Sequence, residues 1–305
     1  MPGVEARHGA AAHRRAVPGS PEDLADVEAG LDSLDSVPVR RTPLWSRLRR
    51  KVLPPLFATV LALASWQLAV STGVAPPDKL PSPASVADSF RYLWLQGSLF
   101  EIIWTSVRRG LLGFLVAVAI GTPLGLIVAR VALIRAALGP VLSGLQSLPS
   151  VAWVPAAVLW LGLTSSAMYA VILLGAVPSI ANGLTAGIRH VPPLHLKVGR
   201  SIGATGWRSA WHVLMPAALP SYLSGLKQGW AFSWRSLMAA ELIASSPDLG
   251  VGLGRYLENA RESIDLPGVF LGIALILLVG VAVDLLVFCP LERRVLRSRG
   301  LLTEG

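Results

Sequence analysis

The chain has 305 residues, of which 53% are hydrophobic and only 15% are charged, and its mean hydropathy is +0.58. Ordinary soluble domains carry about 25% charged residues, so this composition excludes a typical soluble protein and indicates a membrane protein. The net charge is +9, but the positively charged residues lie between apolar runs rather than on one polar domain, which argues against nucleic-acid binding. The single cysteine, Cys289, excludes an internal disulfide and a four-cysteine metal site.

Residues 1–52 differ in composition from the rest of the chain. They are rich in Pro, Gly, Ala and mixed charge and hold few large apolar residues. Such a segment cannot bury enough surface to offset its conformational entropy, so we expect a disordered cytoplasmic tail. A cleaved signal peptide has an early apolar core, whereas the first long apolar run here follows the tail. We therefore expect the tail to stay attached.

Six later segments are apolar enough to cross a membrane, since a helical span needs roughly 20 such residues. They are approximately Leu56–Val74, Leu111–Val131, Leu142–Leu163, Ala167–Ile188, Leu223–Ala244 and Val269–Phe288. Strands of a membrane barrel would instead alternate over about ten residues. The sequence therefore predicts an all-α membrane protein with about six transmembrane helices and a transmembrane domain over 53–290.

The positions of Lys and Arg predict the orientation of the chain. If the N-terminus is inside, most of the 27 Lys and Arg residues fall in inner segments, including the loop 189–222 and a C-terminal tail, 291–305. Both termini are therefore expected in the cytoplasm. The outer segment 75–107 is expected to form a Pro-rich turn and a helix, with Trp94 and Trp104 at the level of the lipid headgroups.

The inner loop between the fourth and fifth predicted spans contains no Asp or Glu. We expect a helix over Leu194–Ile202 and a break at Gly203. A second helix is expected over Thr205–Leu214, stopping at the prolines that follow, Pro216 and Pro220. The loop should therefore form a helical hairpin on the cytoplasmic face.

Two tryptophans of this loop, Trp207 and Trp211, lie four residues apart and share one helix face. A paired aromatic face suits the docking of another protein. It equally suits packing of both rings onto the membrane helices or the headgroups. The residues alone leave both interpretations open.

The loop resembles the "EAA" loop of binding-protein-dependent ABC import permeases, whose pattern is Glu-Ala-Ala, three residues, Gly, nine residues, Ile, one residue, Leu-Pro. The glycine and the proline of the pattern fall on Gly203 and Pro216, whereas Lys197-Val198-Gly199 stands in place of Glu-Ala-Ala. The acidic residue of the family therefore has no counterpart here. The resemblance implies a coupling hairpin that seats in a groove of the ATP-binding subunit through Gly203, Ala204, Thr205, Trp207, Arg208 and Trp211.

Further runs resemble the nitrate, sulfonate and taurine branch of these importers: LPSPASV (80–86), SVRRGLLGF (106–114), VPAAVLWLGL (154–163), SWRSLMAAELI (233–243) and LGVGLG (249–254). The resemblance implies a type I importer permease in the bacterial plasma membrane, working with an external solute-binding protein and two copies of an ATP-binding subunit. The implied substrate is a small anion, with aliphatic sulfonates favoured over nitrate and taurine. Because the chain lacks a GxxxxGK[ST] phosphate loop, we expect ATP hydrolysis in a partner, and no catalytic residue, metal or cofactor in this chain.

A homodimer is the simplest way for a chain without an internal repeat to build a two-fold pore. Glycines spaced four apart allow helices to approach closely, and we expect them to pack helices within one subunit. These pairs are Gly121 with Gly125, Gly183 with Gly187, and Gly225 with Gly229. Asp284, in the sixth predicted span, should pair with a basic group on a neighbouring helix.

Arg235, Trp234 and Glu241 are the candidate residues of a translocation path. Arg235 lies near the midplane of the fifth span, where an arginine costs at least ~2.5 kcal/mol unless it faces protein or water. It either attracts an anion or makes a buried ion pair or carbonyl contact. Trp234 shares a helix face with Trp230, and its ring either lines a cavity or packs against neighbouring helices. Glu241 suits a gate or a helix contact better than a substrate ligand, because a carboxylate repels anions.

Two other classes of membrane protein compete with this interpretation. A secondary active transporter for a small anion would usually show inverted repeats and mid-membrane carboxylates, whereas the mid-span charge here is a cation. An intramembrane enzyme would need a nucleophile and a base in the membrane, but all five His residues lie in the tail or in the loop 189–222.

Overall fold

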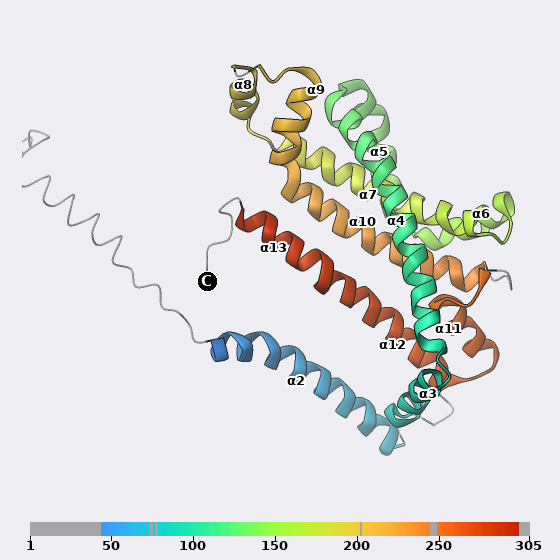
Figure 1. Ribbon diagram of the computed structural model, residues 1–305. Helices are drawn as coiled ribbons and strands as arrows, with labels where there is room; N and C mark the ends of the chain where they lie inside the picture. The colour runs from blue at the N-terminus through green and yellow to red at the C-terminus, as the bar shows by residue number, and fades with distance from the viewer. Residues whose placement is uncertain (1–43, 74–75, 77–78, 202, 245–248, 299–305) are drawn as a thin grey trace, which may run out of the picture. The chain divides into compact units, whose positions relative to one another are not determined.

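The computed structural model describes residues 44–73, 76, 79–201, 203–244 and 249–298, and within them it contains helices and no strand (Figure 1). The chain divides into two units, Met1–Ala62 and Leu63–Gly305. In chain order the described elements are α2 (Leu44–Ser71), α3 (Pro83–Leu95), α4 (Ser98–Arg130), α5 (Ala132–Ser147), the 3₁₀ turn η1 (Ser150–Trp153), α6 (Val154–Leu161), α7 (Ser165–Arg189), α8 (Pro193–Ser201), α9 (Gly206–Ser209), the π-helical segment η2 (Ala210–Leu214), α10 (Met215–Ile243), α11 (Leu253–Glu262), α12 (Leu266–Val283), the π-helical segment η4 (Asp284–Phe288) and α13 (Cys289–Arg297).

Four helices of the described part are long and apolar enough to cross a membrane: Leu53–Ser71 within α2, α4, α7, and Leu266–Arg297 across α12, η4 and α13. The bent pair formed by α5 with η1 and α6 adds a fifth if it counts as one span. The fifth predicted segment lies in α10, which has 29 residues and is about 44 Å long at 1.5 Å per residue. It is the most polar of the six because it carries Lys227, Arg235 and Glu241. A helix of that composition needs protein or water around its polar side.

The third predicted span, Leu142–Leu163, is not one continuous helix, and that detail of the prediction was wrong. α5 ends at Ser147, and the two halves of the segment are bent by 101°. Leu148 has an extended backbone, with φ −77° and ψ 131°. The ring of Pro149 accounts for this, because a proline disfavours the helical region for the residue before it.

The prediction that the second hairpin helix stops at Pro216 and Pro220 was also wrong. α9, η2 and α10 follow one another without a gap from Gly206 to Ile243. Pro216 lies in the first turn of α10, directly after the π-helical segment η2. The wider π turn changes the hydrogen-bond partners at this point, so the missing proline N–H does not end the helix. The hairpin is thus joined to the fifth span by continuous helical backbone.

α7 packs between α4 and α10 through close backbone contacts. A Cβ on Gly183 of α7 would lie 2.5 Å from the Cα of Gly225 in α10, and a Cβ on Gly125 of α4 would lie 2.8 Å from the carbonyl oxygen of Ala181 in α7. Side chains at these positions would force the helices apart. The other predicted glycines are equally crowded by neighbouring helices of the same chain: Gly121, Gly187 and Gly229. The expectation that these pairs pack helices within one subunit is confirmed.

The ends of the chain differ in part from the predicted tails. α2 begins at Leu44, so residues 44–52 are helical rather than disordered, in keeping with their content of Leu, Arg and Lys, which are good helix formers. The rest of the predicted tail, 1–43, lies outside the described residues. At the other end, α13 continues to Arg297.

Candidate functional site

The hairpin of the inner loop turns at glycines. Gly203 has φ +83° and Gly206 has φ +54°, a left-handed backbone that favours glycine. The turn is closed by the Ala204 N–H, which donates to the Gly199 carbonyl at 2.8 Å. The break predicted at Gly203 is therefore confirmed, and it lies between α8 and α9 (Figure 1).

The two arms of the hairpin pack directly against each other. A Cβ on Gly199 of α8 would lie 2.9 Å from a methyl group of Val213 in η2, so glycine is needed for this approach. The guanidinium of Arg130, at the end of α4, donates to the Gly206 carbonyl at 3.2 Å. The hairpin is thus built from its own two arms and is tied to the membrane domain by α4 and by α10.

The residues predicted to contact an ATP-binding subunit gather at the tip of the hairpin. Gly203, Thr205 and Arg208 are exposed, Ala204 is half-buried, and Trp211 is 55% exposed. The backbone of Trp207 lies in α9, but its side chain lies outside the described residues, so the paired aromatic face stays a prediction.

α10 presents a polar stripe on a helix whose other faces are buried or half-buried. The exposed residues of its central part recur at helical spacing: Ser221, Ser224, Gln228, Ala231 and Arg235. The largest buried residues of the other faces include Tyr222, Trp230 and Trp234. A membrane helix that exposes serine, glutamine and arginine would be costly against lipid, so this stripe indicates a side that faces water or another subunit.

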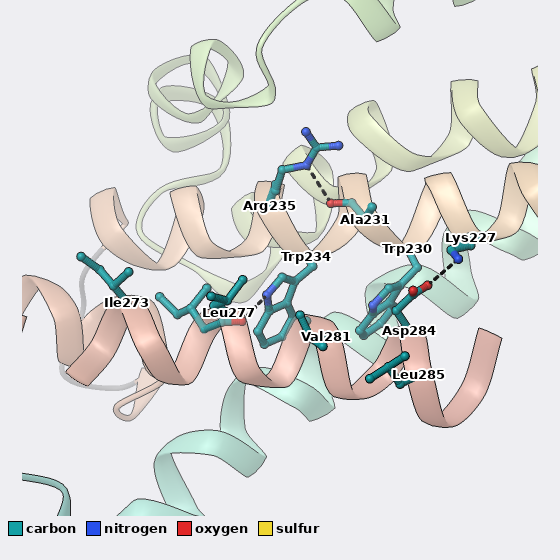
Figure 2. A pocket seen from close by; sticks show the side chains of 12 residues that line it. Lys227, Trp230, Ala231, Trp234, Arg235, Ile273, Leu277, Val281, Asp284 and Leu285 are labelled. Carbon is teal, nitrogen blue, oxygen red and sulfur yellow. Dashed lines mark hydrogen bonds and ion pairs between the residues drawn. The ribbon is translucent and has the colours of Figure 1, made fainter. Parts of the chain in front are cut away.

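Arg235 is the only charged member of this stripe. Its Nε donates to the Ala231 carbonyl at 3.1 Å, and its guanidinium lies 4.7 Å from the ring centre of Phe232. Within the described residues it forms no ion pair with a carboxylate. Figure 2 shows its side chain projecting from α10 on the side away from α12. Arg235 is therefore an exposed cation in the C-terminal third of α10, with its charge uncompensated in the part of the chain that the structure describes.

A cavity of about 700 Å³ lies between α10 and the α12–η4 segment, and Ala231 and Arg235 of the stripe are among the residues that line it. Trp230 and Trp234 line it from α10 and face α12 (Figure 2), and the Trp234 indole N–H donates to the Ile276 carbonyl at 3.2 Å. At one end of the cavity Lys227 pairs with Asp284 at 2.9 Å. The predicted basic partner of Asp284 on a neighbouring helix is therefore confirmed.

Glu241 lies in a buried polar cluster and is only 1% exposed. Its carboxylate accepts hydrogen bonds from the Ser106 hydroxyl at 2.7 Å, from the Arg109 guanidinium at 3.0 Å and from the Gly254 N–H at 3.0 Å. Sequence reasoning missed this cluster, although SVRRGLLGF, SWRSLMAAELI and LGVGLG each contribute to it. Their joint presence was the available signal, but nothing in one sequence pairs a carboxylate with an arginine 132 positions away.

Known transport proteins are similar to this chain over most of its length. Residues 121–296 match the family of binding-protein-dependent transport system inner membrane components. The chain is 30% identical over 275 residues to SsuC of Bacillus subtilis (strain 168), which is named as an aliphatic sulfonates transport permease; the alignment covers 90% of this chain and 97% of that protein. It is 27% identical over 243 residues to the taurine transport system permease protein TauC of Escherichia coli (strain K12), covering 78% and 87%.

The fold also has a solved counterpart. A chain of the MetNI methionine ABC transporter, in an inward-facing conformation, matches with a TM-score of 0.55 at 17% sequence identity, covering 65% of this chain and 95% of that one. The chain therefore belongs to the family of binding-protein-dependent transport system inner membrane components, the multi-pass permease subunits of ABC importers.

Proposed function

We propose that this permease imports a small anion, delivered by an external binding protein and driven by a separate ATPase subunit. The observation that carries the proposal is Arg235, an exposed cation on the polar stripe of α10 that no described carboxylate neutralises. A cation in that position lowers the energy of an anion that would otherwise have to cross a low-dielectric region alone. The lone positive charge favours anions over cations.

The stripe of α10 also supports a homodimer. A polar stripe on a span-length helix has to face something other than lipid, and a second copy related by a two-fold axis would bring the two stripes together. Ser224, Gln228 and Arg235 of both copies would then line one water-filled path. Trp234 borders the cavity beside it, and Glu241 contributes as a helix contact near the outer end rather than as a ligand.

We assign to the hairpin the transmission of ATP-driven movement from the ATPase subunit to the permease. We place Gly203, Ala204, Thr205, Trp207, Arg208 and Trp211 in the groove of an ATPase subunit on the cytoplasmic side, one hairpin for each of two copies. Continuous helical backbone runs from Gly206 to Ile243. A displacement of the docked hairpin would therefore reach the helix that carries Arg235 without crossing a flexible joint.

Aliphatic sulfonates are the favoured substrates, with taurine and nitrate as alternatives. The relatives support this choice, because one is named for aliphatic sulfonates and another for taurine. The apolar walls of the cavity beside Arg235, which include Ile273, Ile276 and Leu277, are also better suited to a substrate with a hydrocarbon part than to a small inorganic ion.

The test is uptake into proteoliposomes that contain the permease, its ATPase and its binding protein. Ethanesulfonate, taurine and nitrate serve as separate labelled probes. Uptake should require ATP and persist when ion gradients are collapsed, and Arg235→Gln should lower it at least 10-fold while Arg91→Gln, an exposed arginine of α3, leaves it unchanged. Uptake that follows an ion gradient without ATP would favour a secondary active transporter. Full uptake by Arg235→Gln would remove Arg235 from the path.

A further inference from the structure

A buried polar cluster joins α4, α10 and the segment that leads into α11. Arg109 and Glu241 form an ion pair at 3.0 Å, and their side chains are 8% and 0% exposed. The second guanidinium nitrogen of Arg109 donates to the Leu249 carbonyl. The Ser106 hydroxyl donates to Glu241 and accepts from the Leu253 N–H at 2.7 Å. Three side chains thus connect two membrane helices to the backbone of 249–254.

The backbone of 249–254 lies against this cluster with no room for side chains at two positions. A Cβ on Gly252 would lie 2.5 Å from both carboxylate oxygens of Glu241 and 2.6 Å from the Ser106 hydroxyl. A Cβ on Gly254 would lie 2.6 Å from the Cβ of Glu241. Gly252 has φ −97°, which any residue can adopt, so contact with the cluster rather than backbone conformation requires glycine there.

A buried ion pair is a poor device for stability alone. Apolar residues of similar volume often stabilise a protein as well or better, because they avoid the desolvation of two charges. What a fully hydrogen-bonded polar cluster supplies is one defined arrangement of the elements that meet in it. Here it defines how the end of α10 is joined to α4 and to α11.

The cluster lies at the end of α10 opposite the hairpin. Glu241 is near the last residue of α10, whereas the hairpin enters the same helical backbone at Gly206. Movement of the hairpin can open or close the far end of a path only if the far end of α10 carries its neighbours with it.

We infer that Ser106, Arg109 and Glu241 are positioning residues that couple ATP-driven movement of α10 to α4 and to the 249–254 segment at the far mouth of the path. The inference rests on the proposed function. The cluster touches neither the hairpin nor Arg235, so it affects neither ATP hydrolysis nor the anion directly. Loosening it should separate ATP hydrolysis from transport.

The experiment uses Gly252→Ala in the assembled transporter, with Val251→Ala as its matched control, because Val251 is the adjacent residue and is 41% exposed. ATP hydrolysis and ethanesulfonate uptake are measured in the same proteoliposomes, and co-purification of the ATPase reports assembly. Gly252→Ala should lower uptake per ATP at least 10-fold with the complex assembled, whereas Val251→Ala should match the wild type. Ser106→Ala, which removes hydrogen bonds without adding bulk, should give a loss in the same direction.

The outcomes separate this inference from the proposed function. If both variants keep the wild-type ratio of uptake to ATP hydrolysis, the positioning role is wrong. It is equally wrong if both lose uptake and hydrolysis in proportion to lost assembly, because the cluster then only holds the fold. If the wild-type complex itself shows no ATP-dependent uptake of ethanesulfonate, taurine or nitrate, the proposed function fails instead.

Discussion

Replacing Gly183 by alanine tests the contact that positions α10 against α7. The added Cβ would lie 2.5 Å from the Cα of Gly225, whereas carbon atoms in contact are normally about 3.5–4.0 Å apart. The clash is with backbone, so no side-chain rotation can relieve it. The two helices would have to separate by about 1 Å, and overpacking of this kind costs about 1–3 kcal/mol.

The matched control is Gly144→Ala in α5, where an added Cβ meets nothing within 4 Å. Alanine is favoured over glycine inside a helix by roughly 1 kcal/mol, so the control should be neutral or stabilising. Thermal unfolding of the detergent-purified permease, followed by loss of the monodisperse peak, should therefore place Gly183→Ala well below wild type and Gly144→Ala at or above it. Equal midpoints for the two variants would refute the close α7–α10 crossing.

Three further predictions concern the hairpin, the tail and the segment before α12. Trp211→Asp should lower co-purification of the ATPase at least several-fold without changing the amount of permease in the membrane; unchanged co-purification would exclude Trp211 from the contact. Deleting residues 2–40 should leave uptake unaffected, and lost uptake in a well-expressed deletion would assign the tail a function. Burial and the nearby Asp265 raise the pKa of Tyr256 to about 12 from 10.0, so the folded protein keeps this phenol protonated while the unfolded chain titrates. The resulting contribution to stability is complete below about pH 10 and is lost as the pH rises to about 12. Ultraviolet titration should show this late ionisation in the wild type and not in Tyr256→Phe; ionisation of Tyr256 near pH 10 would contradict it.

Four of the six predicted spans fall on helices long and apolar enough to cross a membrane, and they were predictable because such a helix is encoded by the continuous apolarity of its own residues. The fifth predicted span lies in α10, which is not among these apolar helices. The bend at Leu148 was not predicted, because Leu148 and Pro149 lie inside an apolar run and hydropathy does not register backbone geometry. At Pro216 the error was the reverse, because a helix end was predicted where the helix continues. Its ring ends most helices, but the π-helical segment before it accommodates the missing donor.

The candidate site was also predictable only in part. Arg235 stood out as a charge within an apolar segment, and Asp284 required a basic partner for the same reason, so both were visible locally. The Ser106–Arg109–Glu241 cluster was not visible. Its members are 132 and 135 positions apart along the chain, and only the packing of α4 against α10 brings them together.

The most direct measurement of the central claim is the chemical accessibility of the α10 stripe beside Arg235 in the assembled transporter. Cys289 is the only cysteine of the chain, so a Cys289→Ser background carrying Ala231→Cys, an exposed position one helical turn before Arg235, offers a single thiol and keeps the arginine. A small anionic thiol reagent should modify it, and a transported sulfonate should protect it. Leu278→Cys, from an exposed apolar position of α12 outside the cavity, should stay unreactive in lipid. An Ala231→Cys thiol that resists the anionic reagent, or that reacts equally fast with and without the sulfonate, would contradict the account.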